Sequence, residues 1–149
     1  MRYLKIIFLL VLLCIFSCDK DTTPTLVIPL CSYEYQAFDS TGTSIVAGRI
    51  KFDIIENLSP EDFANNIKIF GDWHFNKIGD PRNIGNQIGS GKLNGLIDDD
   101  TIWINLNPNI SDDNVTLVGK MDGNRIEGVW GYSTFAGLIN SGLFRAEKR

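Results

Sequence analysis

The amino-acid sequence predicts an all-β fold, an antiparallel eight-stranded up-and-down barrel with one short helix. Apolar and polar residues alternate with a period of two over most of the chain after residue 31, which is the pattern of half-buried strands. Clusters of Gly, Asn, Asp and Ser interrupt this pattern at intervals of about 8 to 15 residues, as turns between strands do. The 149 residues are 44% apolar and 11% aromatic, which is typical of one globular domain. A β-sandwich is the alternative, but only a closed barrel leaves no exposed strand edge.

Residues 1–17 are predicted to be a lipoprotein signal peptide. Arg2 and Lys5 precede eleven consecutive apolar residues, Ile6 to Phe16. This run is shorter than the roughly 20 residues that span a bilayer, and it has the length of a signal-peptide core. The stretch Ile15-Phe16-Ser17-Cys18 resembles the lipobox of bacterial lipoproteins. This resemblance implies cleavage before Cys18 and lipidation of its thiol.

Residues 18–30 are predicted to form the lipidated cysteine and a polar tether, and residues 31–149 the barrel domain. The tether begins with Asp19 to Thr25, a stretch without a large apolar residue. Loss of the signal peptide leaves 12 basic and 18 acidic residues, a formal charge of −6, which disfavours binding to nucleic acid. We therefore expect the acyl chains to attach the protein to a membrane of the bacterial cell envelope, with the outer membrane as the expected location.

Eight strands and one helical turn are predicted in the domain. Asp122-Gly123 between two alternating runs is typical of a tight hairpin turn, and Ser40-Thr41-Gly42 and Asp98-Asp99-Asp100 mark two further turns. Ser59-Pro60-Glu61-Asp62 has the capping hydroxyl, the proline and the acidic residues of a helix start. The predicted strands are Ser32 to Asp39, Thr43 to Ile55, Asn66 to Lys77, Gln87 to Ile97, Asp100 to Asn107, Asn114 to Met121, Asn124 to Ser133, and Ser141 to Glu147.

Glycine and tryptophan recur together on the predicted strands. Gly71-Asp72-Trp73 and Gly128-Val129-Trp130 each place the glycine and the tryptophan on one strand face. We expect each tryptophan to pack where its glycine leaves space for the sheet to curve. These units, with the closing run from Gly128 to Ala146, resemble the calycin-like small barrels, which include lipocalins and avidins. The resemblance covers residues 32–148 and implies an eight-stranded barrel, with no ligand-binding residue carried over.

No catalytic or metal-binding residue is assigned from the sequence, and no cofactor is expected. His74 is the single histidine, and alternation places it on the face opposite Trp73, as expected of a solvent-facing residue. A zinc site requires three or four ligands, and the domain offers only Cys31 and His74. Calcium binding at Asp98–Asp100 or Asp112–Asn114 is an alternative to solvated turns. Cys31 is expected to be a small buried hydrophobe, with an intermolecular disulfide as the alternative.

Aromatic residues are predicted to occupy the barrel interior. An eight-stranded barrel is just wide enough for side chains to fill it or to leave room for one small ligand. These residues therefore either pack as a core or line a cavity. They are Tyr33, Tyr35, Phe52, Trp73, Phe75, Trp103, Trp130, Tyr132 and Phe144.

The sequence predicts a non-enzymatic, membrane-anchored envelope lipoprotein whose barrel binds a small apolar or amphipathic ligand. Two alternatives remain open: the barrel binds or inhibits a protein partner through its loops, or it is an envelope hydrolase. The loops in question are 40–42, 79–86 and 108–113, which are rich in Asn, Asp and Gly and carry little apolar area. An empty interior would favour the small ligand, and a filled interior would favour the loops.

Overall fold

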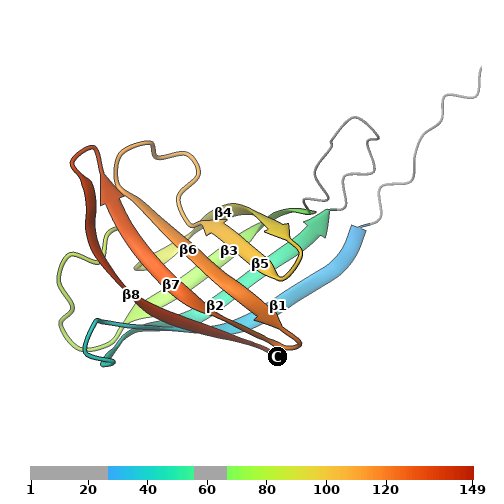
Figure 1. Ribbon diagram of the computed structural model, residues 1–149, viewed down its shortest axis with the longest axis horizontal. Coiled ribbons are helices and arrows are strands. Elements are labelled where there is room, and N and C mark those ends of the chain that lie inside the picture. The colour runs from blue at the N-terminus through green and yellow to red at the C-terminus, as the bar shows by residue number, and fades with distance from the viewer. Residues whose placement is uncertain (1–26, 56–66) are drawn as a thin grey trace, which may run out of the picture.

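In the computed structural model, which describes residues 27–55 and 67–149, eight antiparallel strands close into one barrel (Figure 1). Each strand pairs with its neighbours in the sequence, and β1 also pairs with β8. The predicted up-and-down barrel is therefore confirmed. The strands are β1 (Val27–Phe38), β2 (Ser44–Ile55), β3 (Ile67–Lys77), β4 (Gly89–Asp98), β5 (Thr101–Asn105), β6 (Asn114–Asp122), β7 (Arg125–Thr134) and β8 (Gly137–Lys148).

The first and last strands close the barrel through six residue pairs, which is half the length of each strand. Tyr33 lies opposite Lys148, and Phe38 lies opposite Leu143. The Arg149 N–H donates to the Ser32 carbonyl oxygen at 3.0 Å, which continues the ladder past the end of β8. Closure therefore pairs the two strands that an open eight-stranded meander would leave as edges.

Two strands begin four or five residues earlier than predicted, and the other strand ends agree with the predicted bounds to within two residues. β1 begins at Val27, inside the segment predicted to be tether. β8 begins at Gly137 rather than Ser141, because the β7–β8 turn is formed by residues 135–136 and Gly137 adopts a φ of 98°. The predicted helix at 59–62, the signal peptide and Cys18 lie outside the described residues.

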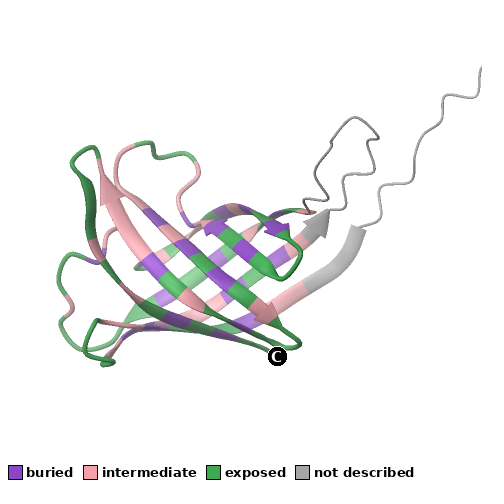
Figure 2. Ribbon diagram, viewed as in Figure 1, coloured by how far each residue is buried: buried purple, intermediate pink, exposed green. Residues whose placement is uncertain are grey.

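Apolar side chains from every strand fill the inside of the barrel. Figure 2 shows buried and exposed residues alternating along the strands, as the period of two predicts. Cys31 is half-buried and packs against this core, in keeping with the expected small hydrophobe. The largest fully buried apolar side chains are Trp130, Phe52, Phe75, Ile50, Ile69, Ile102, Ile104, Leu106, Leu117 and Ile126.

Each buried tryptophan packs over a glycine of the neighbouring strand. Trp73 lies opposite Gly91, and a Cβ added to Gly91 would lie 2.7 Å from the Trp73 Nε1 atom. Trp130 lies opposite Gly142 in the same way, with its Nε1 atom 2.7 Å from such a Cβ. The Trp130 Nε1–H also donates to the Phe38 carbonyl oxygen at 2.8 Å. Only a residue without a side chain leaves room for the indole at these two positions.

The prediction that Gly71 and Gly128 make room for the tryptophans is therefore wrong. A Cβ on Gly71 would lie 2.0 Å from the Lys51 carbonyl oxygen, and a Cβ on Gly128 would lie 2.1 Å from the Val118 carbonyl oxygen. These glycines allow the backbones of neighbouring strands to approach closely where the sheet is strongly curved.

Candidate functional site

The barrel interior holds eight of the nine aromatic residues that were predicted to occupy it. Trp103 is the exception, and its prediction as a core or ligand-lining residue is wrong. It lies on the outer face, 38% exposed, because Ile102 and Ile104 occupy the inward positions of β5. Seven of the eight are buried and Tyr132 is half-buried against the core; the seven are Tyr33, Tyr35, Phe52, Trp73, Phe75, Trp130 and Phe144.

The interior rings contact one another rather than surrounding a space. Tyr35 stacks on Phe75 with a centroid distance of 4.2 Å and on Phe144 at 5.9 Å, and Tyr33 stacks on Phe52 at 5.2 Å. A side chain that faced a space large enough for a ligand would keep accessible surface there, even in a sealed cavity. Phe52 and Phe75 have 0% accessible surface. The barrel is therefore filled around these rings, as the width of an eight-stranded barrel permits.

The Tyr35 hydroxyl group is a polar atom within this packed set. Its oxygen is buried and has no hydrogen-bond partner among the described residues. Burial raises the pKa of Tyr35 well above the ordinary value of a tyrosine. The hydroxyl group therefore stays protonated, and its lost hydration costs stability without a compensating bond.

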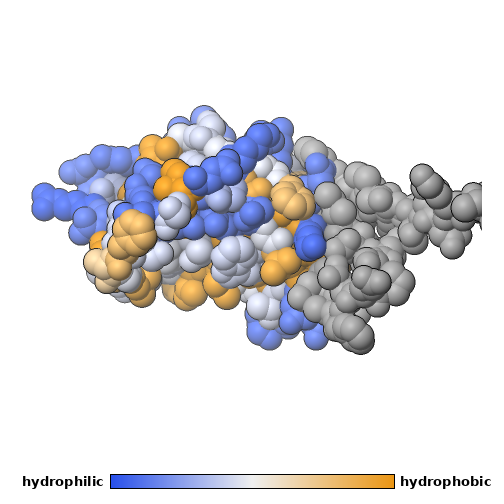
Figure 3. All heavy atoms as spheres, turned by 90° about the horizontal axis from the view of Figure 1, so that it is seen from above, coloured by the Kyte–Doolittle hydropathy of each residue, from blue (hydrophilic) through white to orange (hydrophobic). Residues whose placement is uncertain are grey.

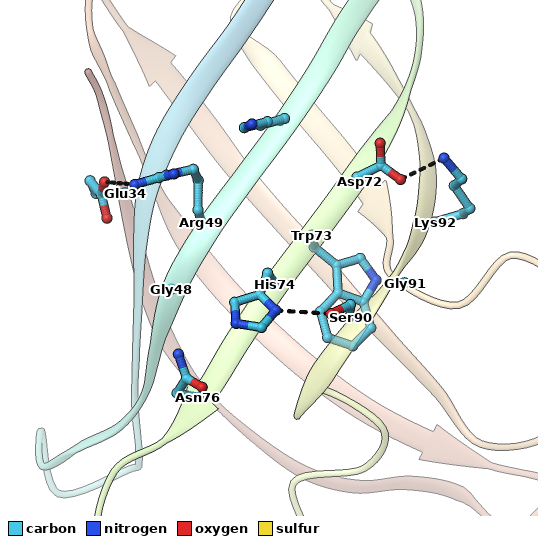
Figure 4. Close-up of a pocket in the computed structure, with 11 residues that line it drawn as sticks. Glu34, Gly48, Arg49, Asp72, Trp73, His74, Asn76, Ser90, Gly91 and Lys92 are labelled. Atoms are coloured by element: carbon cyan, nitrogen blue, oxygen red, sulfur yellow. Dashed lines mark hydrogen bonds and ion pairs between the residues drawn. The ribbon is translucent and has the colours of Figure 1, made fainter.

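A polar groove of about 780 Å³ lies on the outer faces of β1 to β4 (Figure 4). Four of its five charged side chains are paired across strands: Arg49 Nη2 is 3.1 Å from Glu34 Oε1, and Lys92 Nζ is 2.6 Å from Asp72 Oδ1. Lys51 is the fifth. Exposed pairs of this kind contribute little to folding stability. Because the two signs are interleaved, the groove presents no strong field that would select a charged ligand.

His74 points outward into this groove, as alternation predicts, and its Nδ1 atom is 2.9 Å from the Ser90 Oγ atom. A hydroxyl and an imidazole at this distance are two parts of a nucleophilic site. Such a site also needs a group that orients the imidazole and donors that stabilise an oxyanion. Asp72 is engaged by Lys92, and the backbones of β3 and β4 are paired in the sheet at this point. The geometry is that of a surface hydrogen bond.

The acidic turns considered for calcium are engaged in local hydrogen bonds. Asp100 accepts hydrogen bonds from Lys120 Nζ at 2.9 Å and from Thr101 Oγ1 at 3.1 Å, and these bonds lower its pKa. Asp112 Oδ1 accepts the Phe135 N–H at 2.6 Å. Across residues 27–55 and 67–149, no three His, Cys, Asp or Glu side chains come together as metal ligands. These carboxylates hydrogen-bond their own turns to a neighbouring strand or turn.

The three predicted loops lie at one end of the barrel, together with the β7–β8 turn (Figure 1). We call this the loop end and define it by residues 39–43, 78–88, 106–113 and 135–136. The start of β1 and the end of β8 lie at the opposite end. The loop end is thus the end of the barrel farthest from Val27, where β1 begins.

Two segments of the loop end, residues 78–88 and 106–113, cover the core. Ile84, Leu106 and Gln87 are buried, and Gln87 Nε2 donates to the Ile84 carbonyl oxygen at 2.7 Å. The Trp73 Nε1–H donates to the Leu106 carbonyl oxygen at 2.6 Å. The expectation that these loops bury little apolar area is therefore wrong for residues 79–86. The segments form a plug that is bonded to the core, so the surface above them is held in place.

Large apolar side chains are exposed on the β7–β8 hairpin at the loop end. Phe135 is 85% exposed and Leu138 is 67% exposed, and Ile139 is exposed beside them. We call these three residues the apolar tip. Figure 3 shows hydrophobic side chains at this end of the molecule, next to strongly hydrophilic ones. The apolar tip was not predicted, because the predicted strands end at Ser133 and resume at Ser141. An aromatic residue and two aliphatic ones between two strands are nevertheless a signal of an exposed apolar surface.

These observations define a closed antiparallel barrel with a solid aromatic core, whose distinctive groups lie on its outer surface and at the loop end. No protein-family model, curated protein or solved structure matches the chain. No helix among the described residues is long and apolar enough to cross a membrane. Any inference about the function of this barrel protein therefore rests on its fold and on the chemistry of its surface.

Proposed function

We propose that this chain is a lipid-anchored protein of the bacterial cell envelope that acts without catalysis, by binding a protein partner through its loop end. The lipid anchor rests on the lipobox-like stretch that ends at Cys18. The protein partner rests on the structure of the domain. In this proposal the barrel is a rigid support that holds the loop end away from the anchor.

The filled interior is the observation that carries the proposal. The ring of Tyr35 stacks on those of Phe75 and Phe144, and the loop-end plug with Ile84 and Leu106 covers the core above them. A small apolar ligand would have to displace well-packed side chains, which costs several kcal/mol in a close-packed core. Binding at the outer surface has no such cost.

The chemistry of the loop end indicates the kind of partner surface. The apolar tip has little reason to be exposed in an isolated monomer, and protruding aromatic residues are typical anchors of protein interfaces. The loop-end segments carry four acidic residues and the single base Arg82, so a partner with an apolar pocket and a basic rim would be complementary. The acidic residues are Asp39, Asp80, Asp112 and Asp113.

Native purification followed by mass spectrometry tests this proposal. The full chain is purified from the producing cells, and co-purifying proteins and small molecules are identified. We expect a specific protein that is lost with Phe135→Asp and retained with Phe70→Asp, because Phe70 is an exposed aromatic residue on the barrel wall. A partner retained by Phe135→Asp, or a small apolar molecule in place of a protein, would refute binding through the loop end.

The anchor is tested separately. Cys18→Ser should move the protein from the detergent phase to the aqueous phase on phase partitioning, because the acyl chains supply the membrane affinity. Ser17→Thr leaves the cysteine in place and serves as a mild control. Unchanged partitioning of Cys18→Ser would exclude lipidation at this residue.

A further inference from the structure

A row of exposed apolar residues crosses the outer wall of the barrel. Each member lies directly opposite the next on the neighbouring strand, from β4 to β8. The row continues to the half-buried Phe38 on β1, which lies opposite Leu143. We call the five exposed members the apolar stripe; they are Leu96, Trp103, Val118, Val129 and Leu143.

The neighbouring row toward the loop end contains no charged residue. Its members also lie opposite one another on β4 to β8, and they are Asn94, Asn105, Thr116, Gly131 and Ser141. Two adjacent rows over five strands are therefore uncharged in a chain with 21% charged residues. Depletion of charge around an apolar centre distinguishes the core of an interface from ordinary surface.

The row on the other side of the stripe carries two acidic and two basic residues; its members are Asp98, Thr101, Lys120, Glu127 and Arg145. Arg145 Nε is 2.7 Å from Glu127 Oε1, and Arg125 Nη1 is 3.5 Å from the same oxygen. Arg125 Nη2 also lies 3.3 Å from Glu147 Oε1. Arg125 and Glu147 lie one row further out, so the ion pairs join the two rows, and we call these two arginines and two glutamates the Arg–Glu rim. Two copies of this rim would meet without net repulsion, although the chain as a whole is acidic.

We infer that the apolar stripe is the contact surface for a second copy of this chain. A strongly charged partner has no complement on the stripe or on its uncharged neighbouring row, whereas the neutral Arg–Glu rim is complementary to itself. In a two-fold dimer the same patch is used on both copies, as a neutral and apolar surface allows. The contact lies on the barrel wall, so it leaves the loop end free and is independent of the proposed function.

The size of the patch fits this inference. From the exposed fractions of its members, 38% for Trp103 to 58% for Leu143, the stripe exposes on the order of 400 Å² of apolar surface, within the range of functional patches. A stable interface buries about 800 Å² on each partner. The uncharged row and the Arg–Glu rim flank the stripe and supply the remaining area.

Disulfide trapping in intact producing cells tests the dimer with the full chain. Single cysteines are introduced as Val118→Cys, Val129→Cys and Leu143→Cys, and dimers are read on non-reducing gels after mild oxidation. Asn76→Cys is the matched control, because Asn76 faces outward on β3, on the wall opposite β7. We expect at least one stripe cysteine to give a dimer well above the level of the unsubstituted chain and of Asn76→Cys.

A charged residue placed in the apolar stripe should then weaken the contact between the two copies. Val129→Glu, added to the cross-linking Val118→Cys or Leu143→Cys chain, should weaken dimerisation about 100-fold, since like charges would face each other in a two-fold interface. Leu143→Arg, added to the Val118→Cys or Val129→Cys chain, is the second variant if Val129→Glu lowers the amount of folded protein. The inference is overturned if no stripe cysteine cross-links, if Asn76→Cys cross-links equally well, or if both charged variants leave the cross-link unchanged.

Discussion

Replacing Tyr35 by phenylalanine should stabilise the protein. The substitution removes only the hydroxyl group, which is buried and has no hydrogen-bond partner among the described residues. The ring keeps its stacking on Phe75 at 4.2 Å and on Phe144 at 5.9 Å. An unsatisfied buried polar group costs about 1–3 kcal/mol. The free energy of unfolding of Tyr35→Phe should therefore rise by about 1 kcal/mol or more.

The same substitution should change the alkaline limit of stability. Burial raises the pKa of Tyr35 in the folded state, so the stability that depends on its protonation is complete below the pKa of the unfolded chain, about 10. That stability is lost as the pH rises above this value, because the unfolded state ionises first. Tyr35→Phe should reduce this loss. Burial, followed by the nearby Cys31, also raises the pKa of Tyr33, so part of the alkaline loss should remain.

Urea unfolding, followed by tryptophan fluorescence at neutral pH and above pH 10, measures both effects. Tyr35→Leu is the comparison variant, since it lacks both the hydroxyl and the stacked ring and should be less stable than Tyr35→Phe. A decrease of about 1 kcal/mol in Tyr35→Phe would show that the hydroxyl makes a good hydrogen bond, for example to a buried water. In that case the interior holds space around Tyr35, and the filled barrel would be refuted.

Three further predictions concern the wall and the turns. Trp130→Ala should lower the free energy of unfolding by about 3–5 kcal/mol, because it empties a fully buried site; urea unfolding measures this. Gly128→Ala should prevent folding or lower the melting temperature severely, since the new Cβ would lie 2.1 Å from the Val118 carbonyl oxygen; circular dichroism reports both. Hydrogen bonds from the Thr41 hydroxyl and from turn N–H groups lower the pKa of Asp39. Its contribution to stability is therefore present above its ordinary pKa and lost as the pH falls through the lowered value, and Asp39→Asn should flatten the acid side of a stability profile.

Exposed positions supply the controls. Phe70→Ala removes an aromatic side chain from the outer wall and should cost far less than Trp130→Ala; equal costs would contradict the assignment of the core. Gly131→Ala places its Cβ 3.2 Å from the end of the flexible Leu138 side chain, so it should fold, unlike Gly128→Ala. Ser40→Ala leaves the carboxylate of the β1–β2 turn in place and should keep the acid dependence that Asp39→Asn loses.

The sequence was sufficient to predict the eight strands and the closed barrel, because alternation and turn chemistry are local signals. It was also sufficient for the faces of β5, because Thr101 and Asn105 share the face of Trp103 while Ile102 and Ile104 share the other. The burial of Trp103 was predicted wrongly because its aromatic ring was given more weight than the polar residues on the same face. The ring is accommodated on the outer face, where Trp103 lies opposite Leu96 and Val118.

The outer surface features were predictable only in part. Apolar doublets such as Leu117-Val118, Val129-Trp130 and Leu143-Phe144 place one member on each face of a strand. Each doublet is a sign of a strand with an apolar outer position, but the doublets form one stripe only through the pairing of five strands. The position of the β7–β8 turn was also predicted wrongly because of strand pairing. A register shift after Tyr132 puts Leu138 and Ile139 in succession on exposed positions, which breaks the alternation.

The pairing of the first strand with the last has a practical consequence for rearranging the polypeptide. Tyr33 lies opposite Lys148, and the Arg149 N–H bonds to the Ser32 carbonyl oxygen. A short linker from residue 149 to residue 31 would therefore turn the domain into a ring of hairpins. Cutting this ring at the β7–β8 turn, between Phe135 and Ala136, would break no strand. Such a circular permutant would carry its new termini at the loop end, where a fused reporter would stand directly beside Phe135.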